Sequence, residues 1–387
     1  MTVVQLTTDN REPFREYHKA RPWFGAAPAA LLEGFEQIAD VQVHVVSCTQ
    51  QPMTSPEKLA PNIWFHSLHV PPLGWMRTGY QGCIRAVRRK IREIAPEIVH
   101  GQGTERDCAL SAIFSGRTNV VTIHGNMAEI ARLFGPRMFT YRWLAGRLEN
   151  FTLPKTAGVF CNSRYTAALV APRARHTWSV PNALRTAFFT AAPQRSRETV
   201  TILNIGYIEA RKRQLEILAL AGSLHREGLP VRFEFVGQCL GTTAYQREFA
   251  ASVAAAERAG FARWLPEQNP AALIARLDAA SALLHFPLEE AFGLVVAEAL
   301  ARNLKLFGAR VGGIIDIAAD VELAELHAPG DWEGLAEGIR TWLRAGGPRP
   351  QTAAGAMRAR YHPEVVAARH VQIYREVLDT ATVSGAK

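Results

Sequence analysis

Short apolar and β-branched runs alternate with longer helix-like stretches along the first half of the chain. The runs that predict strands are residues 3–7, 41–47, 98–101, 120–124 and 158–161. Between them, apolar residues recur at the spacing of one helix face in residues 27–38, 82–94 and 139–153. Strands that alternate with helices in this way indicate a parallel sheet with helices on both faces.

The alternation stops near residues 181–198 and then starts again. This stretch holds Pro181, Asn182, Pro193 and the polar residues 195–198, a turn-rich composition that predicts a linker. Strands are then predicted at 200–205, 231–236, 282–286 and 305–309, and helices at 214–226, 245–259, 270–280, 295–301, 332–343 and 363–378. We therefore expect two α/β domains in tandem. Their predicted bounds are 1–185 for the first, 186–198 for the linker, 199–362 for the second, and 363–387 for a C-terminal helix and tail.

Composition narrows the class of protein. Of 387 residues, 48% are apolar and 20% charged, a globular balance that excludes a disordered or fibrous chain. No uninterrupted apolar run reaches the roughly 18 residues of a membrane span, and the N-terminus lacks the pattern of a secretory signal. Five scattered cysteines without a CxxC pair favour reduced thiols over a disulfide framework or a zinc site. These observations predict a cytoplasmic protein.

The formal charge of +9 lies entirely in the N-terminal half. Residues 1–190 hold 22 basic and 13 acidic residues, and the remainder holds 22 of each. Such asymmetry suggests an anionic partner, and the basic stretches 82–94 and 132–147 are the candidates for peripheral contact with an anionic membrane. A solvated basic surface is the other interpretation. The neighbouring segment 71–80 carries Trp75 and Met76, which we expect to be exposed. No aromatic–basic module indicates nucleic-acid binding.

Ligands of open parallel sheets bind beyond the carboxyl ends of the strands, so a cleft between two such domains is the expected site. The segment 285–301 (HFPLEEAFGLVVAEALA) enters a helix from a strand. Phe292, Gly293 and Leu294 would form the first helical turn, whose free amides attract anions. A glycine there would let a phosphate come close to the backbone.

Two carboxylates flank this predicted anion site. Glu290 precedes the helix and Glu298 lies within it, eight positions later. A carboxylate accepts hydrogen bonds from paired hydroxyls, so a sugar on one side and a ribose on the other would suit the pair. The alternative interpretation is that Glu290 caps the helix and Glu298 faces solvent.

The same segment resembles the E-x7-E motif of the retaining GT-B glycosyltransferases, in particular glycosyltransferase family 4. Further similar stretches follow the family's order along nearly the whole chain. They are residues 98–101, 120–125 (VVTIHG), 160–167 (FCNSRYTA), Pro181-Asn182 with Phe188, 311–317 (VGGIIDI) and the helix 363–378.

The resemblance implies a GT-B fold of two Rossmann-like domains whose C-terminal helix crosses back to the first domain. It implies that Glu290 contacts hydroxyls of the donor sugar and that Glu298 holds the nucleotide ribose. The backbone at Phe292, Gly293 and Leu294 would approach the diphosphate. No cofactor is implied, and no Asp-x-Asp suggests a metal.

The phosphate-gripping motif departs from the family pattern. Family members carry G-R-L-x-x-x-K after the first strand of the second domain, and Lys212 matches its lysine. Tyr207 stands where the arginine is expected, and Arg211 is the candidate for the missing charge. Loss of the usual Gly-Leu-Pro (here Asn303-Leu304-Lys305) and of the Ser after Pro287 leaves the identity of the donor sugar open.

In the first domain, His124 ends a strand and is followed by a glycine, as in the family, where such a histidine lies near the transferred sugar. Gly25 falls in the loop that approaches the acceptor or phosphate, although the family's second glycine is Ala26 here. We expect His100 to be structural.

The sequence therefore predicts a retaining, hexosyltransferase-type enzyme that uses a UDP- or GDP-sugar and a glycan, lipid-linked or small-molecule acceptor. The alternatives are a catalytically silent GT-B scaffold that binds nucleotide or glycan, and a GT-B sugar-nucleotide epimerase or phosphorylase. A Rossmann dehydrogenase is disfavoured, since no G-x-G-x-x-G follows the first strand.

Overall fold

The computed structural model describes all residues except 134, 136–137, 139, 191–199 and 386–387. The chain divides into two compact units. Unit 1 comprises Met1–Arg185 and Tyr361–Lys387, and unit 2 comprises Thr186–Arg360. Within the predicted linker, Thr186–Phe189 is a 3-10 helix of unit 2, whereas 191–198 lies outside the described residues. Phe134, Arg137 and Phe139 of the basic stretch 132–147 also lie outside them.

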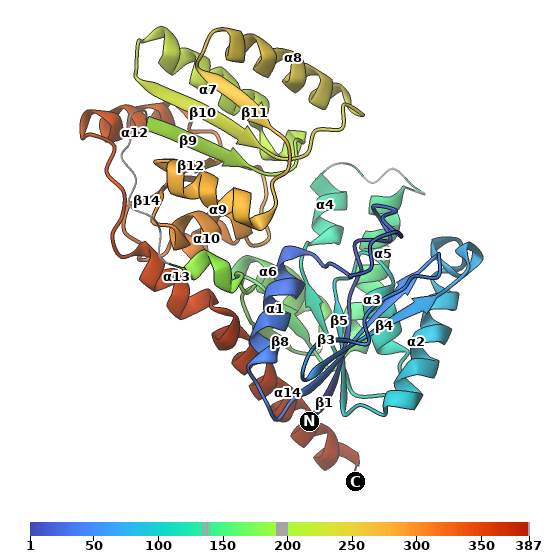
Figure 1. Cartoon of the computed structure of the whole chain (residues 1–387). Coiled ribbons are helices and arrows are strands. Elements are labelled where there is room, and N and C mark those ends of the chain that lie inside the picture. The colour runs from blue at the N-terminus through green and yellow to red at the C-terminus, as the bar shows by residue number, and fades with distance from the viewer. Residues whose placement is uncertain (134, 136–137, 139, 191–199, 386–387) are drawn as a thin grey trace. The chain divides into compact units, whose positions relative to one another are not determined.

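Unit 1 is built on an eight-stranded sheet in the order β3-β4-β2-β1-β5-β6-β7-β8 (Figure 1). All pairs are parallel except β3 with β4, which form an antiparallel hairpin at one edge. The strands are β1 (Thr2–Leu6), β2 (Gln42–Thr49), β3 (Lys58–Ala60), β4 (Ile63–His69), β5 (Ile98–Gln102), β6 (Asn119–Ile123), β7 (Val159–Cys161) and β8 (Thr177–Ser179).

Helices cover both faces of this sheet because its strands alternate their side chains between two cores. Val3 of β1 packs in a core with α1 and α14, whereas Val4 and Leu6 pack in a core with α2 and α3. The helices of unit 1 are α1 (Ala26–Glu36), α2 (Gln81–Ile94), α3 (Asp107–Ile113), α4 (Met127–Leu133), α5 (Tyr141–Thr152), α6 (Arg164–Val170) and α14 (Pro363–Gly385).

The C-terminal helix α14 returns to unit 1 and packs beside α1 (Figure 1). Gly34 of α1 permits this close approach, since a Cβ there would lie 2.2 Å from the carbonyl oxygen of Pro363. Farther along α14, the fully buried Tyr374 hydroxyl lies 2.5 Å from His100 Nδ1 and accepts a hydrogen bond from Gln5. The predicted return of the C-terminal helix to the first domain is confirmed.

Unit 2 carries a six-stranded parallel sheet in the order β11-β10-β9-β12-β13-β14. Its strands are β9 (Val200–Ile205), β10 (Val231–Val236), β11 (Ala262–Leu265), β12 (Ala282–His285), β13 (Lys305–Ala309) and β14 (Ala324–His327). Its helices are α7 (Gln214–Arg226), α8 (Ala244–Arg258), α9 (Pro270–Ala279), α10 (Leu294–Ala301), α11 (Ile314–Ala318), α12 (Trp332–Arg344) and α13 (Ala353–Tyr361). The predicted architecture of two parallel-sheet α/β domains is confirmed.

Several short elements were not predicted from the sequence, among them the strand β4. β4 is one strand of the edge hairpin, and only Ile63 and Phe65 are buried along it. Its two histidines and Ser67 interrupt the apolar run that marks the inner strands. No helix in the described part of the chain is long and apolar enough to cross a bilayer.

Candidate functional site

The loop between β12 and α10 holds most of the predicted donor-site residues. Gly293 is the N-cap of α10, with a φ of 102° that glycine adopts without strain. Glu290 is therefore not the cap residue, and the capping interpretation is wrong. Glu298 is only 7% exposed, so it does not face solvent either. Phe292 is buried and precedes the helix, which begins at Leu294, so the first turn predicted for Phe292, Gly293 and Leu294 started two residues too early.

A glycine pair fixes the position of this loop. Gly312 has a φ of 51°, and a Cβ on it would lie 1.8 Å from the carbonyl oxygen of Glu290. The next residue, Gly313, donates its backbone N–H to that oxygen at 3.0 Å and passes close to the backbone of Phe292. The stretch 311–317 therefore supports the carboxylate-bearing loop, and this role explains its two glycines.

Glu290 and Lys212 form an ion pair. Lys212 ends a 3-10 turn (Ala210–Lys212) after β9, and its Nζ donates to Glu290 Oε2. His285, at the end of β12, places Nε2 3.0 Å from the same oxygen. The Lys212 and Glu290 side chains are only 13% and 14% exposed, so the pair is largely shielded from water.

The electrostatics of this cluster keep Glu290 ionised. Burial alone raises the pKa of Glu290, but the Lys212 cation and the His285 hydrogen bond outweigh it and hold that pKa well below its usual range. Burial lowers the pKa of His285, so its imidazole is neutral near pH 7. Since an ionised carboxylate only accepts, the proton of His285 lies on Nε2 and is donated to Glu290. No role was predicted for His285, although its position at the end of a strand is a signal for this site.

Arg211 is engaged by the protein itself. Its Nη1 donates to the carbonyl oxygen of Glu289 at 2.8 Å, and its Nη2 donates to Glu209 Oε1 at 2.8 Å. A phosphate would have to replace these partners. Tyr207 is 40% exposed, and its carbonyl accepts a hydrogen bond from Gln214. Arg211 thus links the loop that follows β9 to the loop that follows β12.

In unit 1, His124 follows β6 and ends a chain of buried polar groups. His124 Nε2 lies 2.9 Å from Gln102 Oε1, Gln102 donates to Gln5 at 2.7 Å, and Gln5 donates to Tyr374. Burial lowers the pKa of His124 to about 4, and Asn182 partly opposes this shift. A cavity of about 10 Å³ beside the imidazole, lined also by Gln102 and Asn182, is the size of a single water molecule.

The surroundings of two further residues, His100 and Gly25, can be compared with the roles predicted for them. His100 is fully buried between the Tyr374 hydroxyl and Thr122 Oγ1, 2.6 Å from Nε2, which suits a structural histidine. Gly25 is the N-cap of α1 with a φ of −53°, and an added Cβ would meet only Pro28, at 3.7 Å. The local backbone therefore does not require a glycine at position 25.

The structure also gathers three side chains that lie far apart in the sequence. The ligand atoms of Cys48, Cys83 and Asp107 lie within 4.8 Å of one another, and all three residues are buried. The spacing of the cysteines could not reveal this group, because three separate segments bring it together. It lies in the core under α2 rather than with the cluster around Glu290, which belongs to unit 2.

Comparison with known proteins gives two family matches. Residues 29–187 match the model described as Glycosyltransferase Family 4, and residues 188–358 match Glycosyl transferases group 1. No curated protein sequence matches the chain.

The chain also resembles solved structures over nearly its full length. Sucrose-phosphate synthase from Thermosynechococcus elongatus is 16% identical, with 98% of this chain and 100% of that chain covered and a TM-score of 0.78. HepE from Anabaena, in complex with UDP and glucose, is 15% identical, with 96% and 99% covered and a TM-score of 0.71. The lipopolysaccharide outer core galactosyltransferase WaaB is 12% identical, with 97% and 100% covered and a TM-score of 0.67.

At these identities the structural matches establish the fold, and the two family models cover adjacent segments that together run from residue 29 to residue 358. The chain belongs to the glycosyltransferases with the GT-B fold, with a Glycosyltransferase Family 4 domain followed by a Glycosyl transferases group 1 domain.

Proposed function

We propose that the protein transfers a hexosyl group from a nucleotide diphosphate sugar to a hydroxyl of an acceptor, with retention of configuration. The observation that carries this proposal is the cluster of Lys212, Glu290 and His285 in the loop that leads into α10. It combines a cation, an ionised carboxylate and a helix N-terminus, the groups needed to bind a diphosphate and a sugar side by side.

Binding of the donor would exchange the partners in this cluster. The diphosphate carries more negative charge than a single carboxylate, so the ammonium group of Lys212 would turn from Glu290 to the phosphate oxygens. Glu290 would then be free to accept hydrogen bonds from sugar hydroxyls while His285 keeps it oriented. Lys212 and the amides at Gly293 and Leu294 would stabilise the charge that develops on the departing diphosphate. Side chains and amides would neutralise the charge, so we expect transfer without a metal.

The remaining roles follow from position. Glu298, buried on α10, would hold the ribose. The main role of Arg211 would be to position the loop that carries Glu289 and Glu290. It could bind phosphate only after leaving its protein partners. His124 is neutral at physiological pH, so it would act near the reacting carbon as a hydrogen-bonding group and not as a cation. We assign no covalent nucleophile, and departure and attack would occur on the same face of the sugar.

Binding and slow hydrolysis of UDP-, GDP-, ADP- and TDP-sugars would test this function. UDP-glucose is the first donor to examine, because the similar HepE was solved with UDP-glucose. We expect one donor to raise the melting temperature and to be hydrolysed. Glu290→Gln should retain the fold and lose about 10- to 100-fold in turnover, since a charged hydrogen bond contributes ~1.5–3 kcal/mol. Glu267→Gln, at an exposed position of unit 2, is the matched control.

Three kinds of result would contradict the proposal. Wild-type turnover in Glu290→Gln would remove the role of that carboxylate. Failure of every nucleotide sugar to bind would favour the catalytically silent scaffold instead. Formation of an epimerised sugar in the absence of an acceptor, or dependence on inorganic phosphate, would point to an epimerase or a phosphorylase.

A further inference from the structure

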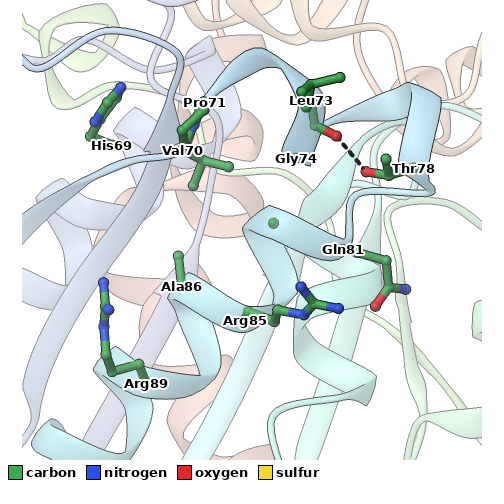
Figure 2. Close-up of a pocket in the computed structure, with 11 residues that line it drawn as sticks. His69, Val70, Pro71, Leu73, Gly74, Thr78, Gln81, Arg85, Ala86 and Arg89 are labelled. Atoms are coloured by element: carbon green, nitrogen blue, oxygen red, sulfur yellow. Dashed lines mark hydrogen bonds between the residues drawn. The ribbon is translucent and has the colours of Figure 1, made fainter.

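A groove of about 600 Å³ lies in unit 1 where the chain passes from β4 to α2 (Figure 2). One wall is the segment from His69 to Gly74, and the other is the first half of α2. Figure 2 shows Leu73 and Thr78 at one end of the groove and Arg89 at the other, with Arg85 between them on the helix. The groove opens at the carboxyl edge of the sheet, where ligands of parallel sheets bind.

The groove is held open by closely packed backbone. A Cβ on Gly82 would lie 2.5 Å from the Cα of Gly74, so the loop rests directly on the first turn of α2. Trp75 anchors the loop from behind, since it is only 6% exposed and its indole N–H donates to the carbonyl of Val70 at 2.9 Å. The expectation that Trp75 is exposed was therefore wrong. Met76 is 44% exposed, as expected, and the neighbouring Leu73 is 75% exposed.

The lining combines an apolar floor with unpaired positive charge. Val70, Pro71, Leu73 and Ala86 supply apolar surface, and no acidic residue is among the lining residues. Arg85 and Arg89 are four positions apart, so their side chains lie on the same face of α2, ~6 Å apart along its axis. Among the described residues, neither guanidinium makes an ion pair or a hydrogen bond.

The electrostatic surroundings add to this charge. Gln81 and Gly82, in the first turn of α2, also line the groove, so the positive end of the helix dipole faces it. Glu93, one turn beyond Arg89, forms an ion pair with Lys90 and lies close enough to Arg89 for a weaker electrostatic attraction. Two free guanidinium groups beside an exposed leucine favour a ligand that carries both an anionic group and an apolar portion.

We propose that this groove is an acceptor subsite for an anionic amphiphile, with a phosphate held by Arg85 and Arg89 and an apolar chain lying against Leu73 and Pro71. The inference rests on the proposed transferase function. β4 and β6 end at the same edge of the sheet with three strands between them, which places the groove ~19 Å from His124 at ~4.8 Å per strand. The acceptor is therefore extended, and its charged end is recognised far from its reacting hydroxyl.

Binding of dodecyl phosphate, kept below its micelle concentration, tests the proposal by calorimetry on the full chain. Arg85→Gln/Arg89→Gln should weaken binding at least about tenfold, as expected from the loss of charged hydrogen bonds. Arg88→Gln/Arg92→Gln removes the same charge from the same helix at positions that do not line the groove, and should change affinity by less than about twofold. Inorganic phosphate and dodecyl maltoside probe the anionic and apolar parts separately, and each should bind more weakly.

Several outcomes would overturn the proposal. Equal weakening in both double variants would mean a general charge effect, and equal affinity for dodecyl maltoside would mean that the phosphate is not recognised. Strong binding to vesicles of phosphatidylglycerol and phosphatidylcholine, lost equally in both double variants, would identify a membrane-facing surface instead.

Hydrolysis of the donor in the absence of an acceptor tests the transferase function independently of the groove. Arg85→Gln/Arg89→Gln should hydrolyse donor at the wild-type rate and lose transfer only to anionic acceptors. If the wild-type protein hydrolyses no donor but still binds dodecyl phosphate through Arg85 and Arg89, the transferase function fails and the anion site stands. If the wild-type protein hydrolyses donor normally but its binding of dodecyl phosphate does not depend on Arg85 and Arg89, the transferase function stands and the anion site fails.

Discussion

At the scale of single residues, the paired charges of Lys212 and Glu290 are expected to depend on each other. Both side chains are largely buried, so either one alone would be a charge with poor solvation. Lys212→Met and Glu290→Gln should each lower the free energy of unfolding by about 3 kcal/mol, the typical cost of breaking a buried pair. The double variant should lose less than the sum of the two, as urea denaturation of all four proteins would measure.

The pair Lys90–Glu93 on α2 serves as the control for this cycle. It is also an ion pair, but Glu93 is 53% exposed, and solvent screening leaves such surface pairs with little effect on stability. The same substitutions there should show a coupling free energy near zero. Additive losses at Lys212 and Glu290 would show that the two charges do not stabilise each other in the folded chain.

The residues of this cluster were only partly predictable from sequence. Glu290, Glu298 and Lys212 stand in a recognisable local pattern, and the resemblance supplied their expected roles. The contacts of Arg211 with Glu289 could not be predicted, because the two residues are 78 positions apart and meet only when two strand-end loops fold side by side. The neutral state of His285 likewise depends on burial, which spacing along the chain does not reveal.

At the scale of elements, the loop before α10 depends on the glycine that supports it. Gly312→Ala would place a Cβ against the carbonyl of Glu290 at a φ of 51°, so the loop or the 311–317 segment would have to shift. We expect a loss of melting temperature and at least about tenfold weaker donor hydrolysis, since a small misplacement of reacting groups costs rate steeply. Gly330→Ala, where no atom lies within 4 Å of the added Cβ, should leave both unchanged. Unchanged hydrolysis in Gly312→Ala would show that the loop tolerates the shift.

Element prediction succeeded where one face of an element is continuously apolar and failed where polar residues interrupt it. The inner strands β1, β9 and β12 are buried along both faces, so their valine, isoleucine and leucine residues stand out. β4 was not predicted because its histidines and serine interrupt that pattern. The groove beside it could therefore not be predicted either. Its shape depends on the contact of Gly74 with Gly82, which no local pattern encodes.

At the scale of the whole molecule, the last helix ties unit 1 together through a buried polar network. Residues at both ends of the sequence meet there, since Gln5 of β1 donates to Tyr374 of α14. His100 and His124 of this network, and His370 packed against it, are neutral because they are buried. Burial lowers the pKa of His370 to about 4, lowers that of His124 to about 4, and lowers that of His100 well below its usual value.

These histidines should make the protein sensitive to acid well above the range in which carboxylates titrate. Below about pH 6.5 a histidine of the unfolded chain binds a proton, whereas His370 stays neutral in the folded chain until about pH 4. The unfolded state then holds more protons, so the free energy of unfolding falls with pH by as much as about 1.4 kcal/mol per unit for each such group. His370→Gln should reduce this slope between pH 4.5 and 6 by about one proton in equilibrium unfolding measurements. The exposed His18→Gln is the control that should leave it unchanged. An equal slope in all three proteins would mean that His370 accepts a proton in the folded state, and that burial does not exclude its charged form.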